Sequence, residues 1–387
     1  MSSVRQVDIA RKVGVSIRAV GFALGDNPAQ HRKVSAETRR KIIETAKELG
    51  YHPHRSAQMM RKGRTNLIGL LQFGGLVQTN ELRELYAAKA IQASGFNTLS
   101  THVHWYADNA SEGITNAIHN ILQARVEGIV LDAPTEHLSE EHLKLLLAAN
   151  IPMVALSGTR IQGIPQVRTD VYQGMFDITR HALSLGHRRL VFIGKRGVTE
   201  DTIRAHPNFD FLWSSRERVN GFEAAIRESG IPGIEHEVIF SEMESPILTP
   251  YDEGKSVMQI LLQRSPRPDV IVCSNDRWAI GALSACSQVG VRVPEDIAIT
   301  GFDNDMITPF TQPPLTTVAQ QTKELSTTAV ALLLVAIKEK RTVLDGVTKI
   351  PALLTIRESC GDLLKHPDDA MQKLIRDGTR EELIRGT

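Results

Sequence analysis

Residues 7–24 (VDIARKVGVSIRAVGFAL) combine two short helical patterns with a tight turn between them. The apolar residues of the first pattern recur at helical spacing: Val7, Ile9, Ala10 and Val13. Gly14 interrupts this helix, and Ser16 is a suitable N-cap for the next one. Two short helices joined by a turn that contains glycine form a helix-turn-helix, whose second helix can lie in the major groove of DNA.

A third amphipathic helix is expected from Ser35 to Leu49, with Gly50 at its end. An ordinary three-helix packing unit would show the same pattern, but the charge distribution argues against it. Residues 1–64 carry 14 Lys and Arg against 5 Asp and Glu, a net charge of +9, whereas the remaining residues carry −8. A basic head on a mildly acidic body is typical of a protein that binds polyphosphate with one end.

The length of 387 residues suits two or three domains, and no apolar run approaches the length of a membrane span. The N-terminal residues lack the apolar segment of a signal peptide, so a cytoplasmic protein is expected. The three cysteines, Cys273, Cys286 and Cys360, lack metal-ligand spacing and are interpreted as buried thiols. His102 and His104 share one strand face without a third ligand at a helpful spacing, so no metal is expected.

From Asn66 onward, apolar strands alternate with helices, and the alternation restarts after residue 165. Runs of this kind predict parallel sheets covered by helices on both faces. Two successive sets predict two similar lobes. Ligands bind such sheets at the carboxyl ends of the strands, so a small-molecule site is expected between the lobes.

Several motifs resemble, in order and spacing, those of the lactose/galactose repressor family of transcriptional regulators. They are DIARKVGVS, VSAETRRKIIETAKELGYHPHRSA, LSLGHRRLVFIG, SSRERVNGFEAA, RPDVIVCSNDRWAIGAL, VRVPEDIAITGFDN and QPPLTTVAQ. The resemblance covers about residues 4–359. It implies an all-α helix-turn-helix head, followed by an α/β body with two doubly wound parallel-sheet lobes, like a periplasmic binding protein. It also implies a homodimer that represses transcription from a pseudo-palindromic double-stranded operator under the control of an effector, with a sugar or sugar derivative favoured.

The resemblance divides the chain into five parts, with the chain crossing between lobes near Pro165, near Pro314–Val318 and near Ile350. They are a DNA-binding domain (1–52), a hinge helix or linker (53–65), a first lobe (66–165 and 318–349), a second lobe (166–317 and 350–359) and a C-terminal extension (360–387).

Within the second helix, the residues expected to contact DNA include Ser16, Ile17, Arg18 and Phe22. Arg18 can bind guanine O6 and N7, whereas Phe22 can only make apolar contact, for example with a thymine methyl group. The family's threonine and second serine, which contact phosphate, are replaced by Ala19 and Gly21. The longer loop after this helix carries Arg32 and Lys33, which can restore phosphate contacts. A head that no longer binds a specific sequence is the alternative.

Residues 53–65 form either a hinge helix or a plain basic linker, since a helix this short is marginal in water. The resemblance places Met60 where the family inserts a leucine into the minor groove, and Arg55 is a further DNA-binding candidate. Packing of Met59 and Met60 between two hinge helices is the alternative to a wedge.

Three residues of the second lobe match effector contacts of the family: Arg218, Asn275 and Asp303. A carboxylate, a guanidinium and an amide that converge on a pocket can bind vicinal hydroxyls or a charged group. Each can instead be a helix cap or an ion pair. Phe73 and Ser157 are the candidates of the first lobe, and the serine stands where some sugar-binding relatives carry aspartate.

Motifs of nucleotide-binding enzymes, serine hydrolases and zinc proteases are absent from the sequence, so neither an enzyme nor a cofactor is expected. The alternative function is a solute-binding protein of a transporter. Such a protein has no use for a basic helix-turn-helix.

Overall fold

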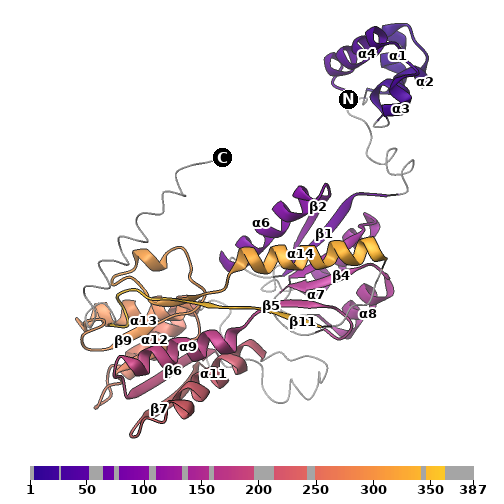
Figure 1. Cartoon of the computed structure of the whole chain (residues 1–387). Coiled ribbons are helices and arrows are strands. Elements are labelled where there is room, and N and C mark those ends of the chain that lie inside the picture. The colour runs from indigo at the N-terminus through magenta and orange to yellow at the C-terminus, as the bar shows by residue number, and fades with distance from the viewer. Residues whose placement is uncertain are drawn as a thin grey trace. The chain divides into compact units, whose positions relative to one another are not determined.

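The computed structural model describes residues 4–25, 28–51, 64–73, 78–103, 110–132, 138–156, 161–195, 213–241, 249–340 and 346–361. The chain forms two compact units, a head (Met1–Thr65) and a body (Asn66–Thr387) (Figure 1). In the described ranges, no helix is both long enough and apolar enough to cross a membrane.

The described head is helical, as the sequence predicted. Its helices are α1 (Gln6–Val13), α2 (Ile17–Leu24), α3 (Pro28–His31) and α4 (Ala36–Glu48). Gly14 ends α1 with φ of 77°, a left-handed conformation that a residue with a Cβ adopts only at a cost. Ile9, Val20 and Ile42 are fully buried, one from each of α1, α2 and α4, so these helices share one small core.

The first sheet of the body has six parallel strands in the order β11-β5-β4-β3-β1-β2. These strands are β1 (Leu67–Phe73), β2 (Asn97–Val103), β3 (Gly128–Asp132), β4 (Met153–Leu156), β5 (Gln166–Thr169) and β11 (Val347–Ile350). Helices α6 (Gln78–Ala93) and α14 (Thr322–Glu339) share one apolar core with the sheet. Helices α7 (Ala110–Gln123) and α8 (Glu140–Ala148) share a second core with it. The buried strands read as continuous apolar runs because both faces of the sheet are covered.

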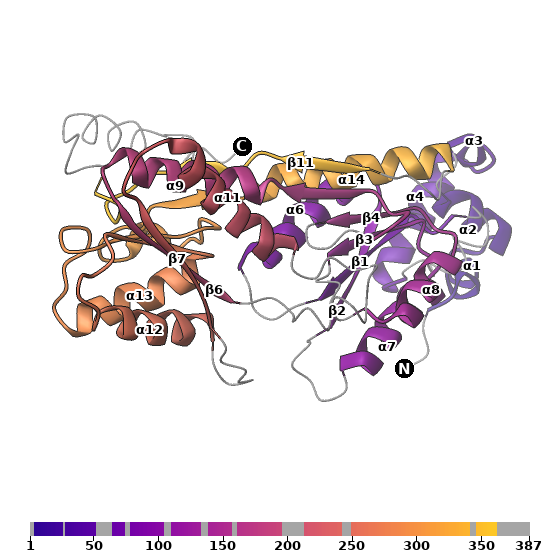
Figure 2. The ribbon, with the colours of Figure 1, turned by 90° about the horizontal axis from the view of Figure 1, so that it is seen from below.

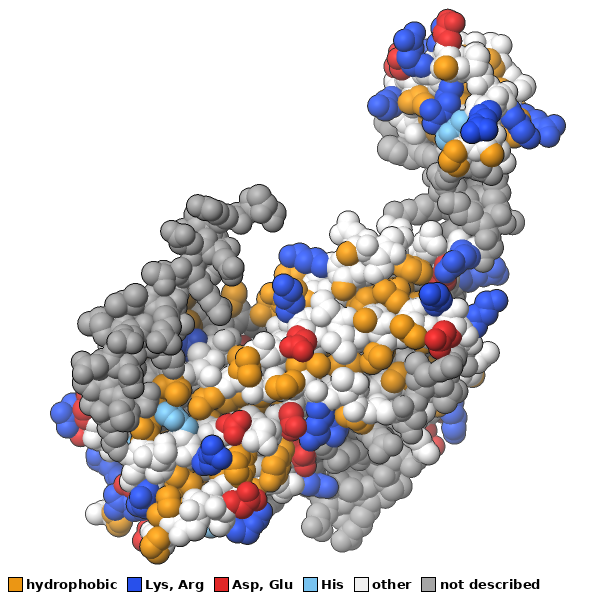
Figure 3. All heavy atoms as spheres, viewed as in Figure 1, with side chains coloured by type: hydrophobic (Ala, Val, Ile, Leu, Met, Phe, Trp, Pro, Cys, Tyr) orange, Lys and Arg blue, Asp and Glu red, His pale blue; other side chains and the backbone are white. Residues whose placement is uncertain are grey.

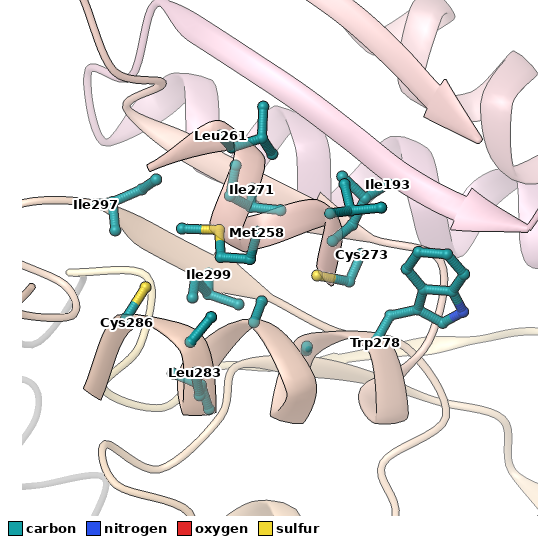
Figure 4. Packing of buried hydrophobic residues seen from close by; sticks show 14 of the residues in the cluster. Ile193, Met258, Leu261, Ile271, Cys273, Trp278, Leu283, Cys286, Ile297 and Ile299 are labelled. Carbon is teal, nitrogen blue, oxygen red and sulfur yellow. The ribbon is translucent and has the colours of Figure 1, made fainter. Parts of the chain in front are cut away.

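The second sheet has four parallel strands in the order β7-β6-β8-β9. They are β6 (Arg189–Lys195), β7 (Glu235–Ser241), β8 (Val270–Cys273) and β9 (Ala298–Thr300). Helices α9 (Val171–Ser184) and α11 (Trp213–Ser229) cover one face, and α12 (Pro250–Leu261) and α13 (Asp276–Gln288) cover the other (Figure 2). Figure 4 shows the core under α12 and α13, to which Met258, Trp278 and the strand residue Ile271 all contribute. A helical head followed by two doubly wound lobes confirms the predicted fold class.

The chain passes between the two sheets three times. The segment expected to open the second lobe is β5, which is hydrogen-bonded between β4 and β11 in the first sheet. The first passage therefore comes after Thr169, later than the boundary at residue 165. The second passage runs through β10 (Thr317–Ala319), after the short 3₁₀ helix η2 (Thr308–Phe310), and the third through β12 (Leu353–Thr355). These last two strands pair antiparallel as a small sheet of their own.

Helices α12 and α13 approach each other closely at two glycines. A Cβ atom at Gly281 would overlap the carbonyl oxygen of Tyr251 and lie 2.8 Å from the amide nitrogen of Lys255. A Cβ atom at Gly254 would overlap the carbonyl oxygen of Trp278. Both contacts are with backbone atoms, which cannot rotate away as a side chain does. Glycine is therefore required here by packing.

We expect Gly281→Ala to destabilise the body by roughly 1–3 kcal/mol, because the overlap with α12 forces the helices apart. Helix propensity alone predicts the opposite, a gain of about 1 kcal/mol for alanine over glycine. The measurement is thermal or urea unfolding. Ser284→Ala, at an exposed position of the same helix, is the matched control and should change stability little. A Gly281→Ala protein as stable as the parent would show that the helices are not held this closely.

Candidate functional site

The first turn of α2 is exposed on the head. The hydroxyl oxygen of Ser16 accepts a hydrogen bond of 3.1 Å from the backbone nitrogen of Ala19 and so caps the helix, as predicted. Ile17 is 51% exposed and Arg18 is exposed, whereas the inner face of the helix is buried. In the view of Figure 3, Lys and Arg predominate among the charged side chains visible on the head. The start of α2 is thus free to meet a ligand and is surrounded by positive charge.

The ring of Phe22 lies close to two cations. The Arg18 guanidinium carbon is 5.5 Å from the ring centroid, and the Lys33 ammonium nitrogen is 5.0 Å from it. Arg32 is also exposed, on the turn that follows α3. Two further predicted DNA contacts, Arg55 and Met60, lie outside the described residues.

In the second lobe, the structure brings Arg218 and Asp303 together. Arg218 lies on α11 and Asp303 follows β9, and an Nη2–Oδ1 distance of 3.7 Å separates their charged groups. The guanidinium also lies 4.7 Å from the ring centroid of Phe302. Both charged side chains are mostly buried, at 13% and 14% exposure. Within the described part of the chain, Nε of Arg218 is buried without a hydrogen-bond partner.

Burial dominates the electrostatics of this pair. It raises the pKa of Asp303, and the positive charge of Arg218 acts in the opposite direction. Burial also lowers the pKa of Arg218, although the charge of Asp303 opposes this. The backbone of Asp303 has φ of 116°, a strained conformation for a residue with a side chain. A desolvated, loosely paired charge on a strained backbone is typical of a binding site.

Asn275 caps α13, because its side-chain oxygen accepts a hydrogen bond of 3.1 Å from the backbone nitrogen of Trp278. Asp276 is fully buried and accepts hydrogen bonds from the Thr317 hydroxyl group and the Asp305 backbone. Asp276 therefore has the structural role expected of a residue at a helix start. The side-chain nitrogen of Asn275 is not used in this cap and remains available for an effector.

Sequence reasoning missed a second arginine–aspartate pair, in the first lobe. Arg83 of α6 donates two hydrogen bonds, of 3.0 and 3.1 Å, to Asp132 at the end of β3. The Nη2 atom of Arg83, one of the two donors to Asp132, also donates to the side-chain oxygen of Asn80. The backbone oxygen of Asn80 accepts from Gln72 at 2.8 Å. Burial raises the pKa of Asp132, and Arg83 opposes this. The sequence signal that could have identified this pair is the position of Asp132 at the carboxyl end of an apolar strand.

The pair from the first lobe borders a small pocket together with apolar strand residues. The lining is Leu70, Leu71, Gln72, Arg83, Glu84, Ala87, Val130, Asp132 and Leu156. The charge of Arg83 acts, with that of Arg218, against the larger effect of burial, which raises the pKa of Asp303. Of the first-lobe residues proposed from sequence, Ser157 lies outside the described residues, and so does the side chain of Phe73.

No group of three His, Cys, Asp or Glu side chains that could hold a metal ion occurs within the described ranges. His102 pairs instead with Glu84 at 2.8 Å, and His104 lies outside those ranges. Cys273, Cys286 and Cys360 are buried thiols, as predicted.

Two family models match the chain. Residues 7–54 match bacterial regulatory proteins of the lacI family, and residues 179–360 match a periplasmic binding protein-like domain. Catabolite control protein A of Priestia megaterium is 26% identical over 358 residues, covering 91% of this chain and 98% of that protein. The transcriptional regulator DegA of Bacillus subtilis is 29% identical over 327 residues, covering 82% and 87%.

The transcriptional repressor PurR of Pasteurella multocida is 27% identical over 342 residues, covering 86% of this chain and 92% of that protein. Among solved structures, the Lac repressor dimer bound to operator and the anti-inducer ONPF has a TM-score of 0.73. It is 23% identical and covers 93% of this chain and 99% of that chain, so it shows the shared fold. Over nearly its whole length the chain therefore resembles LacI-family regulators, with a lacI-family DNA-binding head joined to a periplasmic-binding-protein-like body.

Proposed function

We propose that the protein is a homodimeric repressor that acts in the cytoplasm and binds a pseudo-palindromic operator through two copies of the head. A small polar effector either weakens or strengthens its binding to the operator. The exposed first turn of α2 supports the DNA-binding part. Ser16, Ile17, Arg18, Phe22, Arg32 and Lys33 are its proposed contacts, with Arg55 and Met60 of the following segment. A solute-binding protein of a transporter is disfavoured, because residues 7–54 match a DNA-binding family.

A single observation carries the effector part of the proposal. Arg218 is buried beside Asp303, and its Nε has no hydrogen-bond partner in the described structure, so the guanidinium has unused hydrogen-bonding capacity. A small molecule with hydroxyl or anionic oxygens would satisfy it. A sugar or sugar derivative is favoured, with Asn275 and the first-lobe residues Phe73 and Ser157 as further contacts. The structure of an Enterococcus faecium family member with bound ribose, with a TM-score of 0.60, adds an analogy to this choice.

Exposed apolar side chains on the body support the proposed dimer. Phe310 is 80% exposed and Met306 is 66% exposed, and both lie on the segment between β9 and β10. Large apolar side chains grouped on a surface are typical of an interface. The Lac repressor that shares this fold is itself a dimer.

The first experiment measures operator affinity against salt. We expect the affinity to fall by roughly 10³–10⁵-fold between about 50 and 200 mM salt, because about 6–10 Lys and Arg contacts with phosphate release condensed counterions. The duplex is one selected by the protein from a random pool. A nearly flat salt dependence would exclude electrostatic binding by the basic head.

A second experiment tests base recognition by Arg18. Arg18→Ala should weaken operator binding by about 1–3 kcal/mol and relax the preference for one guanine in each half-site. Lys41→Ala is the matched control, because Lys41 is an exposed base on α4 whose ion pair with Glu37 lies along that helix. Selection of both variants on random DNA gives the measurement. If the Arg18→Ala protein had the same base preference as the parent, Arg18 of α2 would not take part in base recognition.

A third experiment tests the effector site. Sugars, sugar acids and nucleobases are screened for compounds that raise the melting temperature and change operator affinity. Asp303→Asn and Arg218→Met should each abolish that response while leaving effector-free operator binding largely intact, since an effector acts only through its differential affinity for two arrangements of the lobes.

Removing one partner of a buried ion pair also destabilises a protein, so two controls are needed. The double variant Arg218→Met with Asp303→Asn leaves no uncompensated charge and should still not respond. Arg189→Met breaks the Arg189–Asp269 ion pair of 2.6 Å at the opposite end of the same sheet and should respond normally. A normal response from both single variants at the site would show that the effector binds elsewhere.

A further inference from the structure

We propose that Phe22 is a positioning residue of the DNA-binding surface, whose ring holds Arg18 for base recognition and Lys33 for a phosphate contact. The proposal rests on the proposed operator binding and adds a role for Phe22 that differs from apolar contact with a base. It starts from the two short distances between this ring and the cations beside it.

The contact with Arg18 runs along α2. The two residues are one helical turn apart, so their side chains lie on the same face. The guanidinium carbon lies 5.5 Å from the ring centroid, within the range of a cation–π interaction. Arg18 is otherwise exposed at the start of the helix, and a free arginine there would lose much side-chain freedom on binding a guanine.

The contact with Lys33 comes from a different segment. Its backbone nitrogen donates to the Gln30 carbonyl oxygen at 3.0 Å, and the following residue, Val34, packs on the apolar core of the head. The ring of His31 bonds the Gly25 carbonyl oxygen at 2.6 Å, which ties this turn back to the end of α2. The backbone of Lys33 is therefore anchored, and within the described residues its ammonium nitrogen lies 5.0 Å from the Phe22 ring centroid.

Both cations carry the same charge and repel each other, yet both lie beside one ring. The negative face of an aromatic ring attracts cations, and an exposed cation–π contact is worth about a two- to fivefold change in an equilibrium constant. Holding two cations in place before DNA arrives lowers the entropy lost on binding. Lys33, next to a helix that has Ala19 and Gly21 in place of phosphate-binding side chains, is then the phosphate contact that this ring supports.

The first measurement compares Phe22→Leu with Phe22→Tyr in the full-length protein. The probes are a duplex selected from a random pool by the parent protein and a scrambled duplex of equal length. Phe22→Leu should weaken binding to the selected duplex by about 4- to 25-fold, because both cation contacts are lost. It should relax only the preference for the guanine that Arg18 contacts. Phe22→Tyr keeps the aromatic face and should bind within about twofold of the parent.

A double-mutant cycle with Lys33→Met measures the coupling directly. In the parent, Lys33→Met should weaken binding to both duplexes and reduce the salt slope by about one. In the Phe22→Leu protein the same substitution should cost at least twofold less. Lys12→Met is the matched control: Lys12 is an exposed base of the head paired with Glu48 at 3.0 Å, and its effect should be equal in both backgrounds.

The results separate the possible roles of Phe22. A changed base preference in Phe22→Leu at a position other than the guanine that Arg18 contacts, with additive effects of Lys33→Met, would overturn the proposal in favour of direct base contact. Additive effects without a changed preference would also overturn it, since the ring would then hold neither cation. If the parent protein bound no duplex specifically, the proposed function itself would fail, a result distinct from either of these.

Discussion

The hydrogen bonds of Gln320 join the two sheets of the body. Its side-chain oxygen accepts from the Thr169 hydroxyl group at 3.2 Å, and its side-chain nitrogen donates to the carboxylate of Asp303. Thr169 ends a strand of the first sheet, and Asp303 follows a strand of the second. The side-chain amide of Gln320 therefore contacts both Thr169, where the chain leaves the first sheet, and the Asp303 carboxylate of the proposed effector site. Any ligand that moves Asp303 acts directly on the connection between the lobes.

The charge pattern around this connection explains why a small ligand can have a large effect. Each lobe contributes one buried arginine–aspartate pair, but the pairs differ in quality. Arg83 and Asp132 make two well-formed hydrogen bonds, whereas Arg218 and Asp303 are 3.7 Å apart. A buried charge with poor pairing is costly, and a ligand that completes its hydrogen bonds removes that cost. The second pair is the incomplete one, and this supports its choice as the proposed effector site.

The head differs from the body in that its core is small and its proposed DNA-binding residues lie on its surface. Three helices each contribute a fully buried side chain, and the left-handed Gly14 sets the turn between the first two. This leaves the first turn of α2 exposed. The side chains there are organised by contacts among themselves, such as the capping hydroxyl of Ser16 and the ring of Phe22.

The sequence by itself determined the helical head and the alternation of strands and helices, and it named Arg218 and Asp303 as candidate effector contacts. Periodicity, caps and charge are local properties, so they can be read along the chain. Only the tertiary structure decided that β5 belongs to the first sheet, that Arg83 meets Asp132 across 49 residues, and that Lys33 lies beside Phe22. The physical reason is that strand order and the packing of separate segments determine such contacts, and neither has a local sequence period.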